Sequence, residues 1–229
     1  MSRRATEIPG CDTHDMVLVH RAFTREIRLL ADIVEVTSPT DAEQVVRVSA
    51  HGREILTALH HHHLGEDELI WPRLRSAELD SALIDRMQTQ HEEIDAVMRR
   101  VDAELSEWEH QGGAETTDLL VEGLLRLSEL LTEHLRLEED SVLPMVARTL
   151  TPSQWDELGK RGIAAMPKGR ALVFLGYIAE DADAGDWSAF QSHLPLPVRV
   201  LYRLLGRRGY AREVALLRRD LTMSRKVAK

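Results

Sequence analysis

The chain has 229 residues, is 43% hydrophobic and 4% aromatic, and contains 13 glycines, eight prolines and one cysteine. This length and apolar content allow a sizeable buried core, whereas the small numbers of glycines, prolines and aromatic residues argue against an all-β fold. The single Cys11 excludes an internal disulfide and a cysteine-rich zinc site, and the net charge of −9 conceals a basic end, because residues 199–229 hold ten Lys and Arg against two acids.

Helical periodicity dominates the first two thirds of the chain, where apolar residues recur every three or four positions. Pro39 interrupts the first periodic segment, and Thr40 with Glu43 reads as a capping box that starts the second. Gly112 and Gly113 form a turn after the third segment. The helices predicted from this pattern span residues 14–36, 41–68, 81–108 and 117–147.

The remainder of the chain reads as shorter helices. Thr151 is followed by Pro152, which is typical of a cap with proline at the first helical position. Further prolines at 167, 195 and 197 divide the rest of this region, and the last helix is expected over residues 198–221. The sequence therefore predicts an all-α protein. Residues 1–150 would form an antiparallel up-down four-helix bundle, and residues 151–229 a C-terminal helical extension that is basic at its end.

The basic segment permits two interpretations. It can pack against the acidic remainder of the chain, because opposite charges attract, or it can contact nucleic acid, anionic lipid or a protein partner. No nucleic-acid-binding motif is present, so we expect no nucleic-acid partner, whereas a protein partner for the basic C-terminal helix stays open. Residues 1–15 lack the apolar core of a signal peptide, and no stretch has the roughly 20 apolar residues that span a membrane. We therefore expect a cytoplasmic protein without membrane contact.

The segment HHHHLGEDELIWP, residues 60–72, concentrates metal-binding side chains in the second predicted helix. His62 and Glu66 are four residues apart and share one helix face, where they can converge on one ion or on two adjacent ions. The fourth predicted helix repeats the spacing in HLRLEEDSVLP, with His134 and Glu138. A proline follows each glutamate by six residues, so the two blocks form an internal repeat with an offset of 72 residues.

The first and third predicted helices join this repeat. His20 precedes His62 by 42 residues, and His91 precedes His134 by 43. Two similar helical hairpins would pack about an approximate two-fold axis, with their histidines and glutamates facing inward. The alternative is a hydrogen-bonded polar face without metal, but burying so many ionisable groups is unfavourable unless they are paired or metal-bound. Imidazole and carboxylate without thiolate suit iron, with zinc or manganese as alternatives, and two ions inside a bundle favour iron.

These residues resemble the ligand pattern of hemerythrin-like (HHE) domains, over about residues 12 to 150. The resemblance implies a four-helix bundle that holds a non-haem di-iron centre with two iron ions. It also implies four terminal nitrogen ligands and two bridging carboxylates. The histidines would be His20, His62, His91 and His134, and the carboxylates Glu66 and Glu138.

The chain departs from the invertebrate oxygen carriers of this family at two places. The carriers have a second histidine one turn before the residue that matches His91, where this chain has Met87. Their last carboxylate is an aspartate five residues after its histidine, a spacing that only Glu139 matches here. Because Met87 supplies no nitrogen, we expect an open coordination position on that side, and reaction with peroxide rather than a long-lived reversible oxygen adduct.

The neighbouring histidines separate by helix geometry. His63 lies about 100° round the helix from His62, next to the core face, and is a candidate extra ligand. His51 is about 16 Å from His62 along the axis and cannot share its site. His60 points away from the core and should be exposed, and His61 should be solvated or support a ligand. The tyrosines all fall in the C-terminal extension, where a phenolate ligand is the alternative to simple packing.

Two classes of function are compatible with these residues. In the first, a di-iron centre binds or reacts with a small oxidant or gas, namely O2, NO or H2O2, and catalase-like turnover of peroxide is one form of this. In the second, the protein is a non-catalytic iron or redox sensor that signals through its C-terminal helices. The sequence does not decide between turnover and sensing, so it leaves open whether the protein is an enzyme.

Overall fold

The computed structural model describes residues 10–167 and 169–227. Secondary structure in this part of the chain is entirely helical, which confirms the predicted all-α class. Residues 1–9 of the predicted first domain, and residues 228–229 at the basic end, lie outside the described part. Over the described residues, no helix combines the length and apolar composition needed to cross a membrane.

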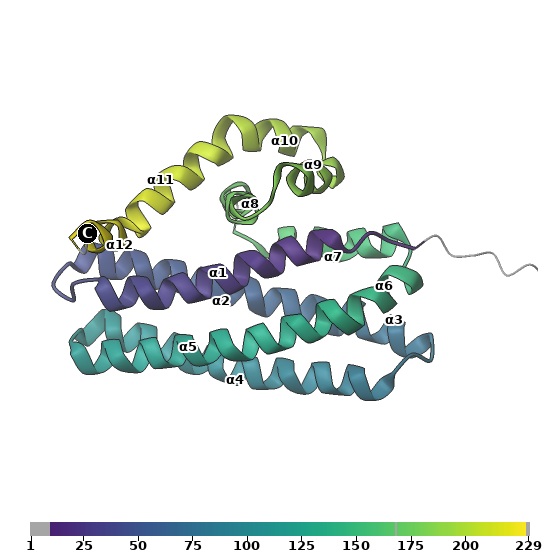
Figure 1. Cartoon of the computed structure of the whole chain (residues 1–229), viewed down its shortest axis with the longest axis horizontal. Coiled ribbons are helices and arrows are strands. Elements are labelled where there is room, and N and C mark those ends of the chain that lie inside the picture. Colours follow the sequence, from purple (N-terminus) through teal and green to yellow (C-terminus); the bar gives the residue numbers. More distant parts are fainter. Residues whose placement is uncertain (1–9, 168, 228–229) are drawn as a thin grey trace, which may run out of the picture.

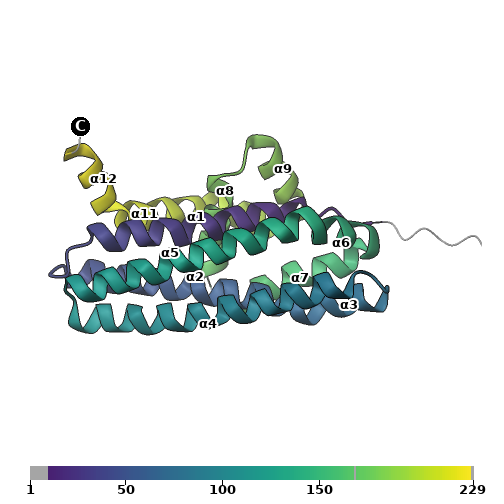
Figure 2. The ribbon, with the colours of Figure 1, turned by 60° about the horizontal axis from the view of Figure 1, so that its bottom comes forward.

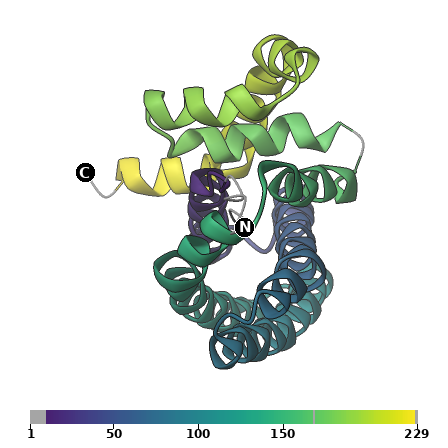
Figure 3. The same cartoon turned by 90° about the vertical axis from the view of Figure 1, so that its right-hand side faces the viewer.

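Four long helices enclose a common interior (Figures 1 and 3). α1 packs against α2 and α5, and α4 packs against the same two helices. Their facing sides carry fully buried aliphatic residues such as Ile27, Leu59 and Leu127, as their periodicity predicts. The helices span His14–Val36 (α1), Ala42–Leu69 (α2), Ser81–Gln111 (α4) and Ala114–Leu137 (α5).

The start of α2 differs from the prediction by one residue. Asp41 is the N-cap, and its Oδ1 accepts a hydrogen bond from the backbone N–H of Gln44 at 3.1 Å. The capping box expected from Thr40 and Glu43 is therefore wrong. The Thr40 hydroxyl instead lies 2.9 Å from that of Ser38, so it is engaged within the turn that precedes the helix.

Both hairpins change conformation at the proline of the internal repeat. α2 ends at Leu69, and the short α3 (Trp71–Ser76) begins directly before Pro72. In the other hairpin, the predicted continuous helix over 117–147 is interrupted, because a π-helical turn (Glu138–Val142) separates α5 from α6 (Leu143–Thr149). Pro144 lacks an N–H and its ring crowds the preceding turn, which accounts for the wider turn upstream of it.

The C-terminal extension consists of shorter helices. The predicted cap of the first of these helices is confirmed, since Thr151 is the N-cap, Pro152 follows it, and Thr151 forms a capping box with Gln154. The single last helix expected over 198–221 is wrong: it contains a π-helical turn and ends at Arg218, where the backbone leaves helical geometry. The helices span Pro152–Ala165 (α7), Arg170–Glu180 (α8), Ala184–His193 (α9), Leu196–Leu201 (α10), Arg207–Leu217 (α11) and Arg219–Val227 (α12), with the π-turn Tyr202–Gly206 between α10 and α11.

The extension covers one side of the bundle (Figures 1 and 2). α8 and α12 contact α1, whereas α7 and α11 contact α2. Arg218 donates to Glu26 of α1 at 2.8 Å, and Arg219 pairs with Asp41 at the start of α2. These two arginines of the basic end pair with acidic residues of the bundle helices, which agrees with the interpretation that the basic segment packs against the acidic remainder of the chain. The division into domains at residue 150 stays a prediction.

Candidate metal centre

Two clusters of potential metal donors lie inside the bundle, with the donor atoms of each cluster within 4.8 Å of one another. α1, α2, α4 and the junction of α5 with the π-turn each supply at least one side chain. None of these side chains is more than 9% exposed. One cluster contains His63, His91 and His134, and the other His20, His62, Glu66 and Glu138. The structure thus brings together all six residues predicted from the repeat and adds the candidate His63.

Glu66 and Glu138 face both clusters. Oε1 of Glu66 lies 3.1 Å from Nε2 of His62, and its Oε2 lies 3.4 Å from Nε2 of His91 in the other cluster. Oε2 of Glu138 is 3.4 Å from Nε2 of His20 and 4.0 Å from Nε2 of His134. A carboxylate placed in this way could contact an ion in either cluster, so the two clusters lie close enough to share Glu66 and Glu138.

His63 fills the side of the centre where Met87 supplies no nitrogen. Its ring stacks on that of His91 with centroids 4.2 Å apart, and it meets His134 edge-on at 5.1 Å. This side therefore has three imidazoles, whereas the other side has only His20 and His62. The nitrogen-poor side, expected beside His91, lies instead beside His20.

Buried polar atoms without hydrogen-bond partners point to a ligand that the protein must hold here. Leaving such atoms unpaired is unfavourable, and most buried polar groups in proteins are paired. A pair of cations would satisfy these atoms except one ring nitrogen of His63, and nitrogen and oxygen donors without sulfur fit iron, manganese or zinc. Within the described residues, the atoms are Nε2 of His20 and His62, both ring nitrogens of His63, both oxygens of Glu66, and Oε2 of Glu138.

The protonation states in the metal-free chain follow from burial. Burial lowers the pKa of His62 and His63 well below the usual value, and burial together with His91 lowers that of His134 to about 2. These imidazoles are neutral and so already in the form that binds metal. Burial, aided by the charge of Glu66, raises the pKa of Glu138 to about 8. Two such carboxyl groups are unfavourable as anions until a cation lies between them.

Two acidic residues contact the Nδ1 atoms of donor histidines and orient their rings. Nδ1 of His91 lies 2.9 Å from Oδ1 of Asp67, which also accepts a hydrogen bond from Nε1 of Trp71 at 2.8 Å. Nδ1 of His20 lies 2.8 Å from Oε1 of Glu139. A carboxylate that accepts from Nδ1 leaves Nε2 of the same ring free to bind metal. Each acid directly follows a bridging glutamate in the repeat, so the pattern contained this signal although the roles were not predicted.

The bond to Asp67 also affects the charge of its histidine. Burial alone would lower the pKa of His91, but the hydrogen bond to Asp67 and the nearby carboxylate of Glu66 outweigh it and raise this pKa to about 9. His91 must therefore lose a proton when it binds a metal. The remaining imidazole, His134, has the amide oxygen of Gln90 3.3 Å from its Nδ1. Sequence reasoning gave no sign of this contact.

The other histidines of the HHHH segment and its surroundings lie where helix geometry predicted. His60 is exposed, and its Nδ1 lies 3.1 Å from Asp95. His61 is half-buried and lines a surface cavity. His51 is buried away from both clusters, with its Nε2 3.2 Å from Oε2 of Glu26.

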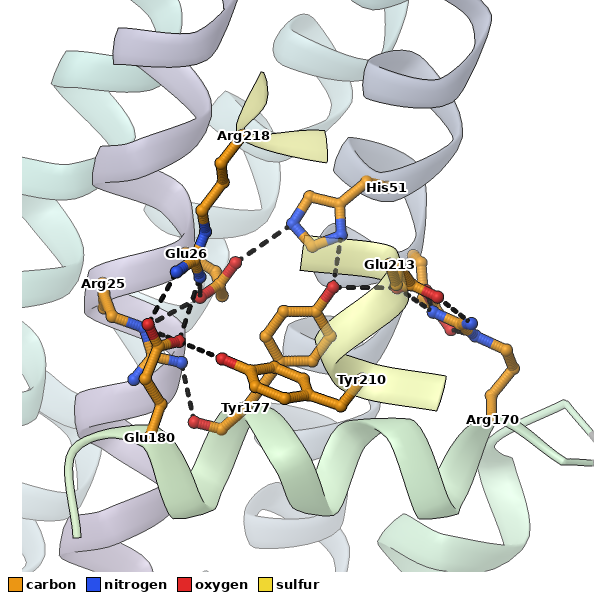
Figure 4. A network of polar contacts seen from close by, with 10 residues as sticks. Arg25, Glu26, His51, Arg170, Tyr177, Glu180, Tyr210, Glu213 and Arg218 are labelled. Carbon is orange, nitrogen blue, oxygen red and sulfur yellow. Dashed lines mark hydrogen bonds and ion pairs between the residues drawn. The ribbon is translucent and has the colours of Figure 1, made fainter. Parts of the chain in front are cut away.

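His51 also belongs to a third group of potential donors, with Glu54 and Glu213. Arg170 already occupies both carboxylates: it pairs with Glu54 and donates to the two oxygens of Glu213 at 2.6 and 2.7 Å (Figure 4). Because one guanidinium already pairs with both acids, the group is an ion-paired network rather than a cation site. Tyr177 lies in the same network, where its hydroxyl contacts Glu213 and His51.

Comparison with known families agrees with this geometry. The model of the hemerythrin HHE cation-binding domain matches residues 11–146, a range that includes every donor of the two clusters and ends before the C-terminal extension. Comparisons with curated proteins and with solved structures give no match. Since the family model covers more than half of the chain, this protein belongs to the hemerythrin HHE cation-binding domain family.

Proposed function

We propose that this protein is an up-down four-helix bundle that holds two iron ions and reacts with hydrogen peroxide. The observation that carries the proposal is the pair of donor clusters that share Glu66 and Glu138. One ion would be held by three imidazoles and the other by His20 and His62, with the two glutamates between them. Two adjacent iron ions can exchange two electrons together, which is the number that reduction or oxidation of peroxide requires.

The surroundings of the donors limit what can react there. All the donor side chains are at least nine-tenths buried, so only a small molecule such as O2, NO or H2O2 can reach them. The side with His20 and His62 has the fewer protein donors and hence more room for such a molecule. Phe23 packs beside His62 with ring centroids 5.3 Å apart, which keeps this side apolar. Glu139 holds the His20 ring in place.

Peroxide consumption by the iron-loaded protein tests the proposal. We expect the protein to consume peroxide faster than the same concentration of free iron, and the His60→Ala variant to behave like the unchanged chain because His60 is exposed. The His62→Ala variant should lose most of this activity together with its iron. A stable, fully reversible oxygen adduct, without peroxide consumption above that of free iron, would refute the proposal.

A second candidate function, iron or redox sensing, is supported by the way the extension is attached. α1 carries both His20 and the residues Arg25 and Glu26 that contact the extension, and α2 carries both His62 and Glu54. A shift of these helices on metal binding would reach α8 and α11, and through them a protein partner of the basic C-terminal helix. Amide hydrogen exchange of α8–α12, compared with and without iron, separates the candidates: sensing requires a difference there, whereas turnover does not.

A further inference from the structure

A row of aromatic rings leads from the metal centre into the C-terminal extension. Phe23 lies 5.3 Å from the ring of His62, Phe174 5.9 Å from Phe23, and Tyr177 6.1 Å from Phe174, all measured between centroids. Tyr210 follows Tyr177 at 5.1 Å. The chain has only three phenylalanines, and two of them stand in this row, where both are buried. The row therefore connects a metal-binding histidine to a buried phenol through closely packed π-systems.

The phenol of Tyr177 has a proton acceptor in contact. Its hydroxyl donates to Oε1 of Glu213 at 2.8 Å, and Nδ1 of His51 lies 3.4 Å from the same hydroxyl oxygen (Figure 4). Burial raises the pKa of Glu213, but the bonds from Arg170 and Tyr177 outweigh it and lower this pKa, so Glu213 is a carboxylate. A phenol that loses an electron becomes a strong acid. Tyr177 can therefore be oxidised where it stands only because a base already accepts its proton.

We propose that Tyr177 is a redox-active residue that donates one electron toward the metal centre. The proposal rests on the proposed reaction with peroxide, which is the oxidant. One peroxide takes up the two electrons of a ferrous pair, so a second peroxide must oxidise the centre further before it can accept an electron from a tyrosine. Tyr177 then gives its phenolic proton to Oε1 of Glu213 and one electron to the centre, which is thereby reduced by one electron. A neutral phenoxyl radical is left on Tyr177. Phe23 and Phe174 are not themselves oxidised, because a phenyl ring holds its electrons too tightly, and they serve as the packed medium through which the electron tunnels.

The environment of Tyr177 exceeds what packing alone needs. A buried phenol is satisfied by one hydrogen-bond partner, whereas Tyr177 has a carboxylate and an imidazole, and that imidazole in turn contacts Glu26 at 3.2 Å. Tyr202 provides the comparison within the same chain. It is also buried, but its ring packs on Trp187, outside the row that leads to His62.

Electron paramagnetic resonance after freeze-quenching tests the inference. Ferrous full-length protein is mixed with an excess of peroxide, more than the one equivalent that converts the iron to the ferric state, and the oxidation of iron is followed optically in the same samples. A tyrosyl radical signal should form in the unchanged chain and in Tyr202→Phe, and should be lost in Tyr177→Phe although its iron content and iron oxidation are the same. Oxidised iron without a radical, or a radical that survives in Tyr177→Phe, would overturn the inference and leave the proposed function intact.

A second measurement does not depend on peroxide. Flash photo-oxidation of the ferric full-length protein by a ruthenium complex removes an electron from the tyrosine that yields it most readily. The radical should form on Tyr177, and more slowly in Glu213→Gln, which keeps the shape of the side chain but removes the base. Equal rates in the two proteins would overturn the role of Glu213 and with it the inference. If peroxide fails to oxidise the iron while this radical forms, the proposed function fails, whereas Tyr177 stands as a redox-active residue with Glu213 as its base.

The path through the rings has its own control. Phe174→Leu interrupts the row between Phe23 and Tyr177, whereas Phe190→Leu changes the third phenylalanine, which stacks on Trp187 away from the row. Phe174→Leu should slow radical formation with peroxide and leave photo-oxidation unchanged, and Phe190→Leu should alter neither. If Phe174→Leu has no effect in the peroxide experiment, the electron does not follow this path.

Discussion

His63 is the residue that breaks the internal repeat at the metal centre. At the offset of 72 residues that relates His62 to His134, the position equivalent to His63 holds Leu135, which packs in the core. Met87 has no such asymmetry, since its counterpart in the first hairpin, at an offset of 71 residues, is Met16. One metal position consequently has three imidazoles and the other two. A centre built from a duplicated hairpin becomes unequal through this one substitution.

The first prediction follows from this inequality. His63→Ala removes the third imidazole beside His91 and should weaken binding of the ion there, whereas the donors His20 and His62 of the other position are unchanged. Elemental analysis after dialysis against a chelator should therefore give fewer than two irons per chain, where the unchanged chain keeps two. His60→Ala, which changes an exposed neighbour, should retain both ions. Two irons in His63→Ala would show that this ring only packs against the ligands.

A second prediction concerns the acids behind the histidines. Asp67→Asn keeps the shape of the side chain but weakens the acceptor for Nδ1 of His91, so iron affinity should fall roughly 10- to 100-fold. Competition with a chelator measures this change. Asp140→Asn is the matched control, because Asp140 is exposed and pairs only with Arg136 one turn away. An affinity unchanged by Asp67→Asn would mean that packing alone orients His91.

At the scale of the helices, repeated sequence patterns predicted the long helices and the donors, whereas features that depend on single contacts were not predicted. Long periodic segments predicted three of the bundle helices to within about three residues, whereas the fourth is interrupted after Leu137; the duplicated spacing predicted six donors that the structure brings together. The repeat could not indicate His63, because the other hairpin has leucine there. The π-turn at Glu138–Val142 precedes Pro144, and the break at Arg218 accompanies ion pairs with Glu26 and Glu180; helical periodicity registers neither.

The packing of α8 on α11 supplies a third prediction. A Cβ atom at Gly176 would lie 2.3 Å from Cγ and 2.5 Å from Cβ of Tyr210, atoms that cannot move without the helix that carries them. Gly176→Ala should therefore push α11 away from α8 and destabilise the protein by about 1–3 kcal/mol. Gly159→Ala, in an open and exposed part of α7, should instead stabilise it by up to about 1 kcal/mol. Thermal unfolding of both variants checks this, and equal midpoints would contradict the close contact.

In the molecule as a whole, buried ion pairs attach the extension to the bundle. Glu26 of α1 is 1% exposed, and its Oε1 accepts hydrogen bonds from Arg25 and Arg218 at 2.8 Å each. Glu180 of α8 pairs with the same two arginines. Two carboxylates and two guanidinium groups thus connect α1, α8 and the end of α11 (Figure 4). These contacts depend on both glutamates being ionised, so the attachment should weaken in acid.

The pKa of Glu26 determines the direction of this pH dependence. Burial alone would raise the pKa of Glu26, but His51, Arg218 and Arg25 together lower it from the usual 4.5. Its contribution to folding is therefore fully present above the unfolded value and is lost as the pH falls through the lower folded value. Glu26→Gln should lower the free energy of unfolding by about 3 kcal/mol at neutral pH, because it leaves two partly buried guanidinium groups with less charge to balance them.

The difference in the free energy of unfolding between Glu26→Gln and the unchanged chain should disappear in acid. Glu26 is then protonated, so the side chain at this position is uncharged in both proteins. Thermal midpoints at neutral pH and below the folded pKa of Glu26 measure this. Glu43→Gln is the control: Glu43 is 79% exposed and pairs with Arg47 one turn away, so its removal should change the free energy of unfolding by less than about 1 kcal/mol at either pH. A gap for Glu26→Gln that stays constant with pH would show that its charge does not hold the extension in place, and that apolar packing of α8 and α11 on the bundle does.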